Sequence, residues 1–95
     1  MVEIILIPNE LSLKVERQYF EYNSALNVVG YLMQRGNINE ELLQKYIDTV
    51  EYRGVQLELT KQAVSKEYVP EHFKNKKYSY LFDFDECSLH FEVIE

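Results

Sequence analysis

The chain has 95 residues with a formal net charge of -6, and 46% of its residues are hydrophobic and 14% aromatic. This composition is typical of one small folded domain. It excludes a disordered tail, a disulfide-rich mini-protein and a collagen-like segment, because these are poor in aromatics, rich in cysteine, and rich in glycine and proline, respectively. The excess of acidic residues opposes contact with a phosphate backbone, so we expect no nucleic-acid partner.

Neither a targeting signal nor a membrane segment is evident. The first residues lack the basic start and the length of apolar run that a signal peptide has, and no apolar stretch approaches the ~20 residues of a membrane span. The single cysteine, Cys87, has no partner for an internal disulfide. We therefore expect a cytoplasmic protein that does not contact a membrane.

The first predicted element is a strand over residues 2–7, a β-branched apolar run that ends at Pro8. Such a run indicates a strand that is buried on both faces or central in a small sheet. Asn9 is the expected cap of a helix over residues 10–35, and Gly36 is its expected stop. The predicted apolar stripe of this helix comprises Val15, Tyr19, Tyr22, Leu26, Val29 and Met33.

A second helix is predicted over residues 39–68, with Asn37 or Asn39 as its cap and Pro70 just beyond its end. The short link predicts that it folds back antiparallel to the first helix. Gly54 in its interior costs about 1 kcal/mol relative to alanine and indicates a bend or a close helix contact. Its apolar residues recur every seven positions at Leu43, Val50, Leu57 and Val64.

The C-terminal part alternates between apolar and polar residues, which predicts strands over residues 78–84 and 87–94. Tyr78, Tyr80, Phe82 and Phe84 share one predicted face of the first strand, and Leu89, Phe91 and Val93 face the core in the second. The turn near Asp85 and Glu86 leaves the register open. We predict a single α+β domain over residues 1–95, with the order β-α-α-β-β and a long antiparallel helical hairpin packed on a small two- or three-stranded sheet.

Candidate catalytic and metal chemistry is sparse. Cys87 and His90 form half of a zinc pattern, with His72 as a distant candidate, but no second ligand pair has the required spacing. On an extended strand Cys87 and His90 also fall on opposite faces. We expect no catalytic residue, cofactor or metal, and keep a metal or thiol site at Cys87 and His90 as a minor alternative.

The sequence favours a surface for another protein. Helices of about 38 and 45 Å exceed what a compact core of this length covers, so we expect a homodimer formed through the hairpin, and a further protein or peptide partner. The aromatics of the first C-terminal strand have two open roles, packing against the helices or forming a peptide platform. The candidate partner-binding residues are Tyr19, Tyr22, Leu26, Val50, Leu57, Tyr78, Tyr80 and Phe82.

Residues 19–26, 39–46, 67–68 and 82–89 together resemble the small accessory proteins of CXXX repeat peptide modification systems. The most specific element is aromatic-x-x-Asp-Phe-x-x-Cys, which runs here from Tyr80 to Cys87. The resemblance implies a helper that binds a cysteine-repeat precursor peptide or its radical-SAM-type modifying enzyme. A small acidic inhibitor or antitoxin, which neutralises one partner protein through its negative surface, is the alternative class.

Overall fold

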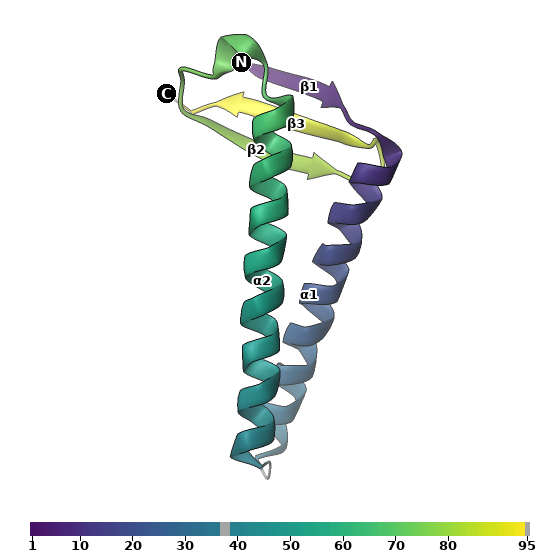
Figure 1. Cartoon of the computed structure of the whole chain (residues 1–95), viewed down its shortest axis with the longest axis vertical. Coiled ribbons are helices and arrows are strands. Elements are labelled where there is room, and N and C mark those ends of the chain that lie inside the picture. Colours follow the sequence, from purple (N-terminus) through teal and green to yellow (C-terminus); the bar gives the residue numbers. More distant parts are fainter. Residues whose placement is uncertain (37–38, 95) are drawn as a thin grey trace. The chain divides into compact units, whose positions relative to one another are not determined.

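The computed structural model describes residues 1–36 and 39–94. Two long helices separate the first strand from the last two, which confirms the predicted α+β class and the β-α-α-β-β order (Figure 1). A short 3-10 helix lies where a loop was predicted. The elements are β1 (Val2–Leu6), α1 (Asn9–Arg35), α2 (Glu40–Tyr68), η1 (Glu71–Phe73), β2 (Tyr78–Asp83) and β3 (Ser88–Val93).

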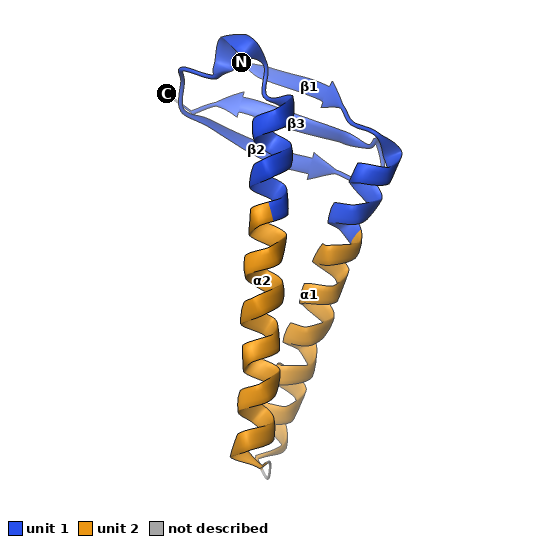
Figure 2. Cartoon of the chain, in the orientation of Figure 1, with its two compact units in different colours: residues 1–16, 60–95 blue, residues 17–59 orange. Residues whose placement is uncertain are grey.

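The contacts divide the chain into two compact units (Figure 2). Unit 1 comprises residues 1–16 and 60–95 and contains the sheet, the start of α1 and the end of α2. Unit 2 comprises residues 17–59 and contains the rest of the helical hairpin. The prediction of a single domain did not anticipate this division, and the two units are described separately.

The sheet of unit 1 is antiparallel with the strand order β1-β3-β2. The prediction that the first strand is central or buried on both faces is therefore wrong, because β1 is an edge strand. It also ends at Leu6 rather than at residue 7. A short apolar run looks the same whether both faces are covered or one apolar face stays exposed, so the pattern alone could not separate these cases.

The register places Leu89 opposite Ile5 and Phe82, and Phe91 opposite Tyr80. Leu89 and Phe91 are fully buried, which confirms the predicted core face of this strand. Residues directly opposite each other share a face, so this face is the covered side of the sheet. With them, the buried apolar core of unit 1 comprises Ile7, Val15, Val64, Val69, Phe73, Leu89 and Phe91.

The turn between β2 and β3 is longer than predicted. Phe84 and Cys87 lie in the turn rather than in strands, and Ile94 lies beyond the end of β3. Cys87 has a φ of 48°, which is incompatible with extended geometry. The N–H of Glu86 donates a hydrogen bond to Asp83 Oδ1 at 3.1 Å. This side-chain acceptor stabilises a turn that carries no Asn-Gly signal.

Three of the four helix ends agree with the prediction, including the end of α2 at Tyr68. Asn39 Oδ1 accepts hydrogen bonds from the N–H groups of Glu41 at 2.8 Å and Leu42 at 3.3 Å, so Asn39 caps α2 and the helix begins at residue 40. Gly36 has a φ of 68° after α1, as expected for a C′ residue. The other candidate cap, Asn37, lies outside the described residues.

The predicted cap of α1 at Asn9 is wrong. Asn9 is already helical, and the N–H of Ser12 donates to the carbonyl of Pro8 at 3.0 Å. Pro8 therefore occupies the capping position, one residue earlier than expected. Its own missing N–H costs nothing there, because the first N–H groups of a helix have no intrahelical partner.

Unit 2 packs the two helices along a stripe that differs from the predicted one on α1. Val29 is buried and Tyr22 half-buried as expected, but Tyr19, Leu26 and Met33 are exposed. Positions 18, 22, 25, 29 and 32 have the same alternating spacing as positions 19, 22, 26, 29 and 33, so spacing alone could not choose between the two stripes. Packing against α2 determines which of the two stripes of α1 is buried.

Gly54 lies in close contact with α1 in unit 2. A Cβ atom built at Gly54 would lie 3.0 Å from Cε1 of Tyr22. Of the two roles predicted for Gly54, a bend or a close contact, the contact is therefore present. Glycine permits it because any side chain would occupy the space of the tyrosine ring.

Candidate functional site

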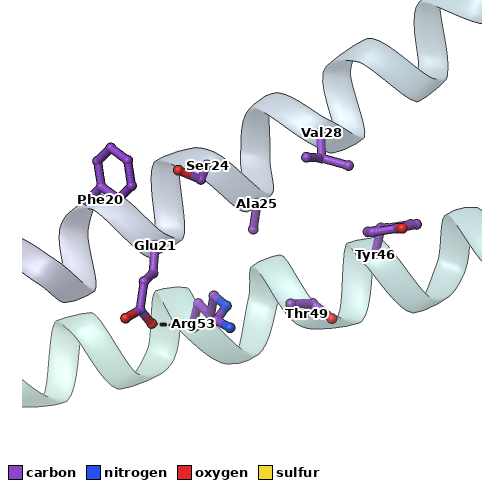
Figure 3. Close-up of a pocket in the computed structure, with 8 residues that line it drawn as sticks. All are labelled: Phe20, Glu21, Ser24, Ala25, Val28, Tyr46, Thr49 and Arg53. Atoms are coloured by element: carbon purple, nitrogen blue, oxygen red, sulfur yellow. Dashed lines mark hydrogen bonds and ion pairs between the residues drawn. The ribbon is translucent and has the colours of Figure 1, made fainter.

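Unit 2 has an open apolar groove along the hairpin, of about 320 Å³ (Figure 3). Its α1 wall carries Phe20 and Val28, and its α2 wall carries Tyr46. Small side chains between them leave the space that the groove occupies. We call this the hairpin groove, and it is lined by Phe20, Glu21, Ser24, Ala25, Val28, Tyr46, Thr49 and Arg53.

An ion pair bridges the helices at one end of the hairpin groove. Arg53 Nη1 lies 2.5 Å from Glu21 Oε2, and both side chains are partly exposed. In Figure 3 Glu21 extends from α1 toward Arg53, while Ala25 and Val28 extend toward the side of Tyr46 and Thr49. Exposed pairs of this kind contribute about 0–1 kcal/mol, so this pair aligns the two helices more than it stabilises them.

The same ion pair borders a smaller polar pocket of about 220 Å³. Gln18, Tyr52 and Gln56 complete its lining. Gln18 Oε1 is buried and has no hydrogen-bond partner in the structure. A buried acceptor without a donor is costly. An apolar groove that ends at a polar pocket can hold an amphipathic segment.

A second groove of about 640 Å³ lies along another side of α2 in unit 2. Its apolar lining is accompanied by two acidic side chains, which distinguishes it from the hairpin groove. We call it the second groove, and it is lined by Tyr22, Val50, Glu51, Gly54, Val55, Glu58 and Leu59.

The structure separates the predicted binding residues of the hairpin. Tyr22 and Val50 lie together in the second groove, whereas Tyr19 and Leu26 are exposed on α1 outside both groove linings. Leu57 is only 5% exposed, so it packs within the protein and offers no surface to a partner. A regular seven-residue repeat marks the buried stripe of a helix, and that is the part least available for binding.

The predicted strand residues Tyr78, Tyr80 and Phe82 lie on the covered face of the sheet and are half-buried. The Tyr78 ring contacts Phe91 edge-on at 5.8 Å between centroids, and Tyr80 contacts Phe82 at 6.2 Å. Both ring contacts lie within the sheet, so packing against the helices stays a prediction. Their role as a peptide platform also stays a prediction.

The minor alternative site does not bring its members together. His90 Nε2 lies 3.7 Å from Asp83 Oδ2, and His72 Nε2 lies 2.8 Å from Glu3 Oε2. The Cys87 thiol donates a weak hydrogen bond to the carbonyl of Phe84, at 3.7 Å. Across residues 1–36 and 39–94, no three His, Cys, Asp or Glu side chains are grouped as metal ligands would be.

None of the residues that line the hairpin groove is among the predicted binding residues. Phe20 and Val28 are apolar residues outside the predicted stripe, and this second line of apolar side chains was the available signal. Tyr46 and Arg53 line the groove only because α2 pairs with α1, so no local sequence pattern could predict their place in it.

Comparison with protein-family models, curated proteins and solved structures finds no match for this chain. Within the described part of the chain, no helix combines the length and apolar character that a membrane crossing requires.

Proposed function

We propose that the protein is a non-catalytic accessory module that binds a precursor peptide or its modifying enzyme and self-associates through its helical hairpin. The observation that carries the self-association is the hairpin groove, an apolar surface between two helices that unit 2 leaves open. The resemblance described above supports the class of partner, and the acidic surface suits a partner with a basic segment.

The hairpin groove is suited to a second copy of itself. Phe20 projects from its rim with 71% of the residue exposed, while Ser24, Ala25 and Thr49 leave space nearby in the same groove. A surface that carries both a large projecting side chain and a space lined by small side chains is self-complementary. Two copies related by a two-fold axis would each place Phe20 in the groove of the other, as knobs pack into holes.

Replacement of Phe20 tests this self-association. Phe20→Glu places a charge in the interface, and we expect it to weaken the dimerisation constant by at least about tenfold, because burial of one phenylalanine contributes about 1.5–3 kcal/mol. Sedimentation equilibrium of the full chain measures the constant. The matched control is Val55→Glu, which places the same charge at a similarly exposed position of the second groove.

The expected result is a weakened dimer for Phe20→Glu and an unchanged one for Val55→Glu. A wild-type protein that stays monomeric at all concentrations contradicts the proposal. Equal weakening by both variants contradicts the assignment to the hairpin groove, and circular dichroism of both variants checks that the helices are retained.

The partner is tested by affinity capture of the tagged protein from the lysate of its own host, with quantitative mass spectrometry. Recovery of a cysteine-rich precursor peptide or a peptide-modifying enzyme in near-equimolar amount supports the proposal. Recovery of the protein alone contradicts the partner-binding part of it. Capture by the double variant Cys87→Ser, His90→Ala should match wild type, because no role in binding is assigned to these two side chains.

A second candidate function is an acidic inhibitor or antitoxin-type protein, which the net charge of -6 favours. Such a complex depends on long-range attraction between opposite charges, so its affinity falls steeply as ionic strength rises. Binding that is nearly independent of salt and is lost in Phe20→Glu favours the accessory module instead.

A further inference from the structure

The edge strand β1 of unit 1 presents backbone groups that the sheet does not use. The N–H of Val93 donates to the carbonyl of Met1 at 3.3 Å, and the N–H of Ile7 donates to the carbonyl of Cys87 at 2.9 Å. Odd-numbered residues of this strand therefore direct their backbone groups toward β3. Because these directions alternate along an antiparallel strand, the N–H and C=O groups of Val2, Ile4 and Leu6 point away from the sheet.

The same three residues carry exposed apolar side chains. Val2, Ile4 and Leu6 are 57%, 58% and 75% exposed. They lie opposite Glu92, His90 and Ser88 of β3, on the face of the sheet that does not hold Leu89 and Phe91. This edge thus combines open hydrogen-bonding groups with unburied apolar surface.

The edge of β1 has no proline, lysine or bulge to keep it from pairing with another strand. Soluble proteins protect such edges with proline, lysine, a bulge or an inward-pointing charge. The strand reads VEIIL and pairs with β3 in continuous register. Its one charged residue, Glu3, lies on the covered face of the sheet, opposite Phe91. There Glu3 Oε2 lies 2.8 Å from Nε2 of His72.

We propose that β1 pairs antiparallel with β1 of a second copy of this chain, centred on Ile4. In this register Ile4 lies opposite Ile4 of the second copy, and Val2 opposite Leu6. Each of these residues can exchange both hydrogen bonds with the residue opposite, so every outward-pointing group of the edge is used. The two sheets then form one continuous sheet around a two-fold axis.

Charge placement favours the second copy in this orientation. In the antiparallel register Glu3 lies opposite Ile5 of the second copy, so no carboxylates face each other. A parallel arrangement would bring the two Glu3 side chains side by side, which is unfavourable. The apolar residues at both ends of the strand, Val2 and Leu6, also match each other across the pair. The strand is therefore complementary to itself, and the pairing uses the same edge of both copies.

This surface lies in unit 1 and shares no residue with the hairpin groove, so the two associations are tested separately. The test uses the full chain carrying Phe20→Glu, which is expected to weaken association through the hairpin groove. Into this background we place Ile4→Pro, which removes an outward N–H. The β1–β3 hydrogen bonds are retained, because the N–H of Ile4 does not face β3.

The matched side-chain comparison is Ile4→Lys against Leu81→Lys. Leu81 lies on the same face of the sheet, opposite His90, and is 68% exposed, but it belongs to β2 at the other edge. Sedimentation equilibrium should show that Ile4→Pro and Ile4→Lys weaken dimerisation by at least about tenfold. Leu81→Lys should leave the constant unchanged.

Amide hydrogen exchange gives the readout at single residues. In the Phe20→Glu chain, exchange at Val2, Ile4 and Leu6 should slow as protein concentration rises over a roughly 100-fold range, because pairing protects these N–H groups. Exchange that is independent of concentration at all three amides overturns the proposal. Equal weakening by Ile4→Lys and Leu81→Lys also overturns it, since the association would then involve the whole exposed face instead of the edge.

Discussion

The close contact at Gly54 makes a quantitative prediction about two glycine positions in helices. Glycine in a helix interior is less favourable than alanine by about 0.5–1 kcal/mol. At Gly30 nothing lies within 4 Å of the added Cβ atom, so Gly30→Ala should raise the free energy of unfolding by that amount. At Gly54 the same gain is opposed by Tyr22.

The opposing contribution follows from the distance. The Cβ atom of Gly54→Ala would lie 3.0 Å from Cε1 of Tyr22. Carbon atoms pack best at about 3.5–4.0 Å, so the ring must give by a few tenths of an ångström. Overpacking of this kind costs about 1–3 kcal/mol. We therefore expect Gly54→Ala to lower the free energy of unfolding by about 0–2 kcal/mol, after the gain in helix propensity is subtracted.

Urea unfolding followed by circular dichroism measures both variants at one fixed protein concentration, since association would shift the transition. A double-mutant cycle isolates the contact: in a Tyr22→Ala background, Gly54→Ala should become stabilising by about 0.5–1 kcal/mol, like Gly30→Ala. The reasoning is refuted if Gly54→Ala stabilises the otherwise wild-type protein as much as Gly30→Ala does.

Two further predictions concern the start of α2 and the core of the sheet. Asn39→Ala removes the acceptor of the Glu41 N–H and should lower the free energy of unfolding in urea by about 1 kcal/mol. Asn39→Asp should retain most of this stabilisation, because aspartate is also a capping residue. An unchanged free energy of unfolding for Asn39→Ala would contradict the capping role. Phe91→Ala should cost about 3–5 kcal/mol by the same measurement, because Phe91 is fully buried. Leu81→Ala, at an exposed position, should change stability by no more than about 0.5 kcal/mol, and similar losses for both would contradict the assignment of the covered face.

The elements whose position depends on neighbours in the chain were predicted well. Gly36 after α1 and Asn39 before α2 mark helix ends through their own backbone and side-chain geometry, without a tertiary partner. The alternation that places Leu89 and Phe91 on one face is likewise a property of the extended chain. These predictions needed no knowledge of what packs where.

The candidate site was predicted less well, because a binding surface consists of apolar residues that remain exposed after the helices have packed. Leu57 belongs to the most regular apolar repeat and is buried, whereas Phe20 lies outside the predicted stripe and projects from the hairpin groove. Hydrophobicity alone does not separate a core residue from a docking residue. The difference becomes visible only when the partner helix shows which apolar side chains it covers.

The amino-acid sequence by itself determined the α+β class, the order of the elements and the helix and strand ends to within one residue, because hydrophobic periodicity, capping residues and turn residues act over a few positions. Tertiary structure alone decided that β1 is an edge strand, which stripe of α1 faces α2, and that Gly54 meets Tyr22. Each of these depends on a choice between arrangements with the same local pattern. Packing between segments that are distant in the chain selects one of these arrangements, because it determines which apolar surface is buried.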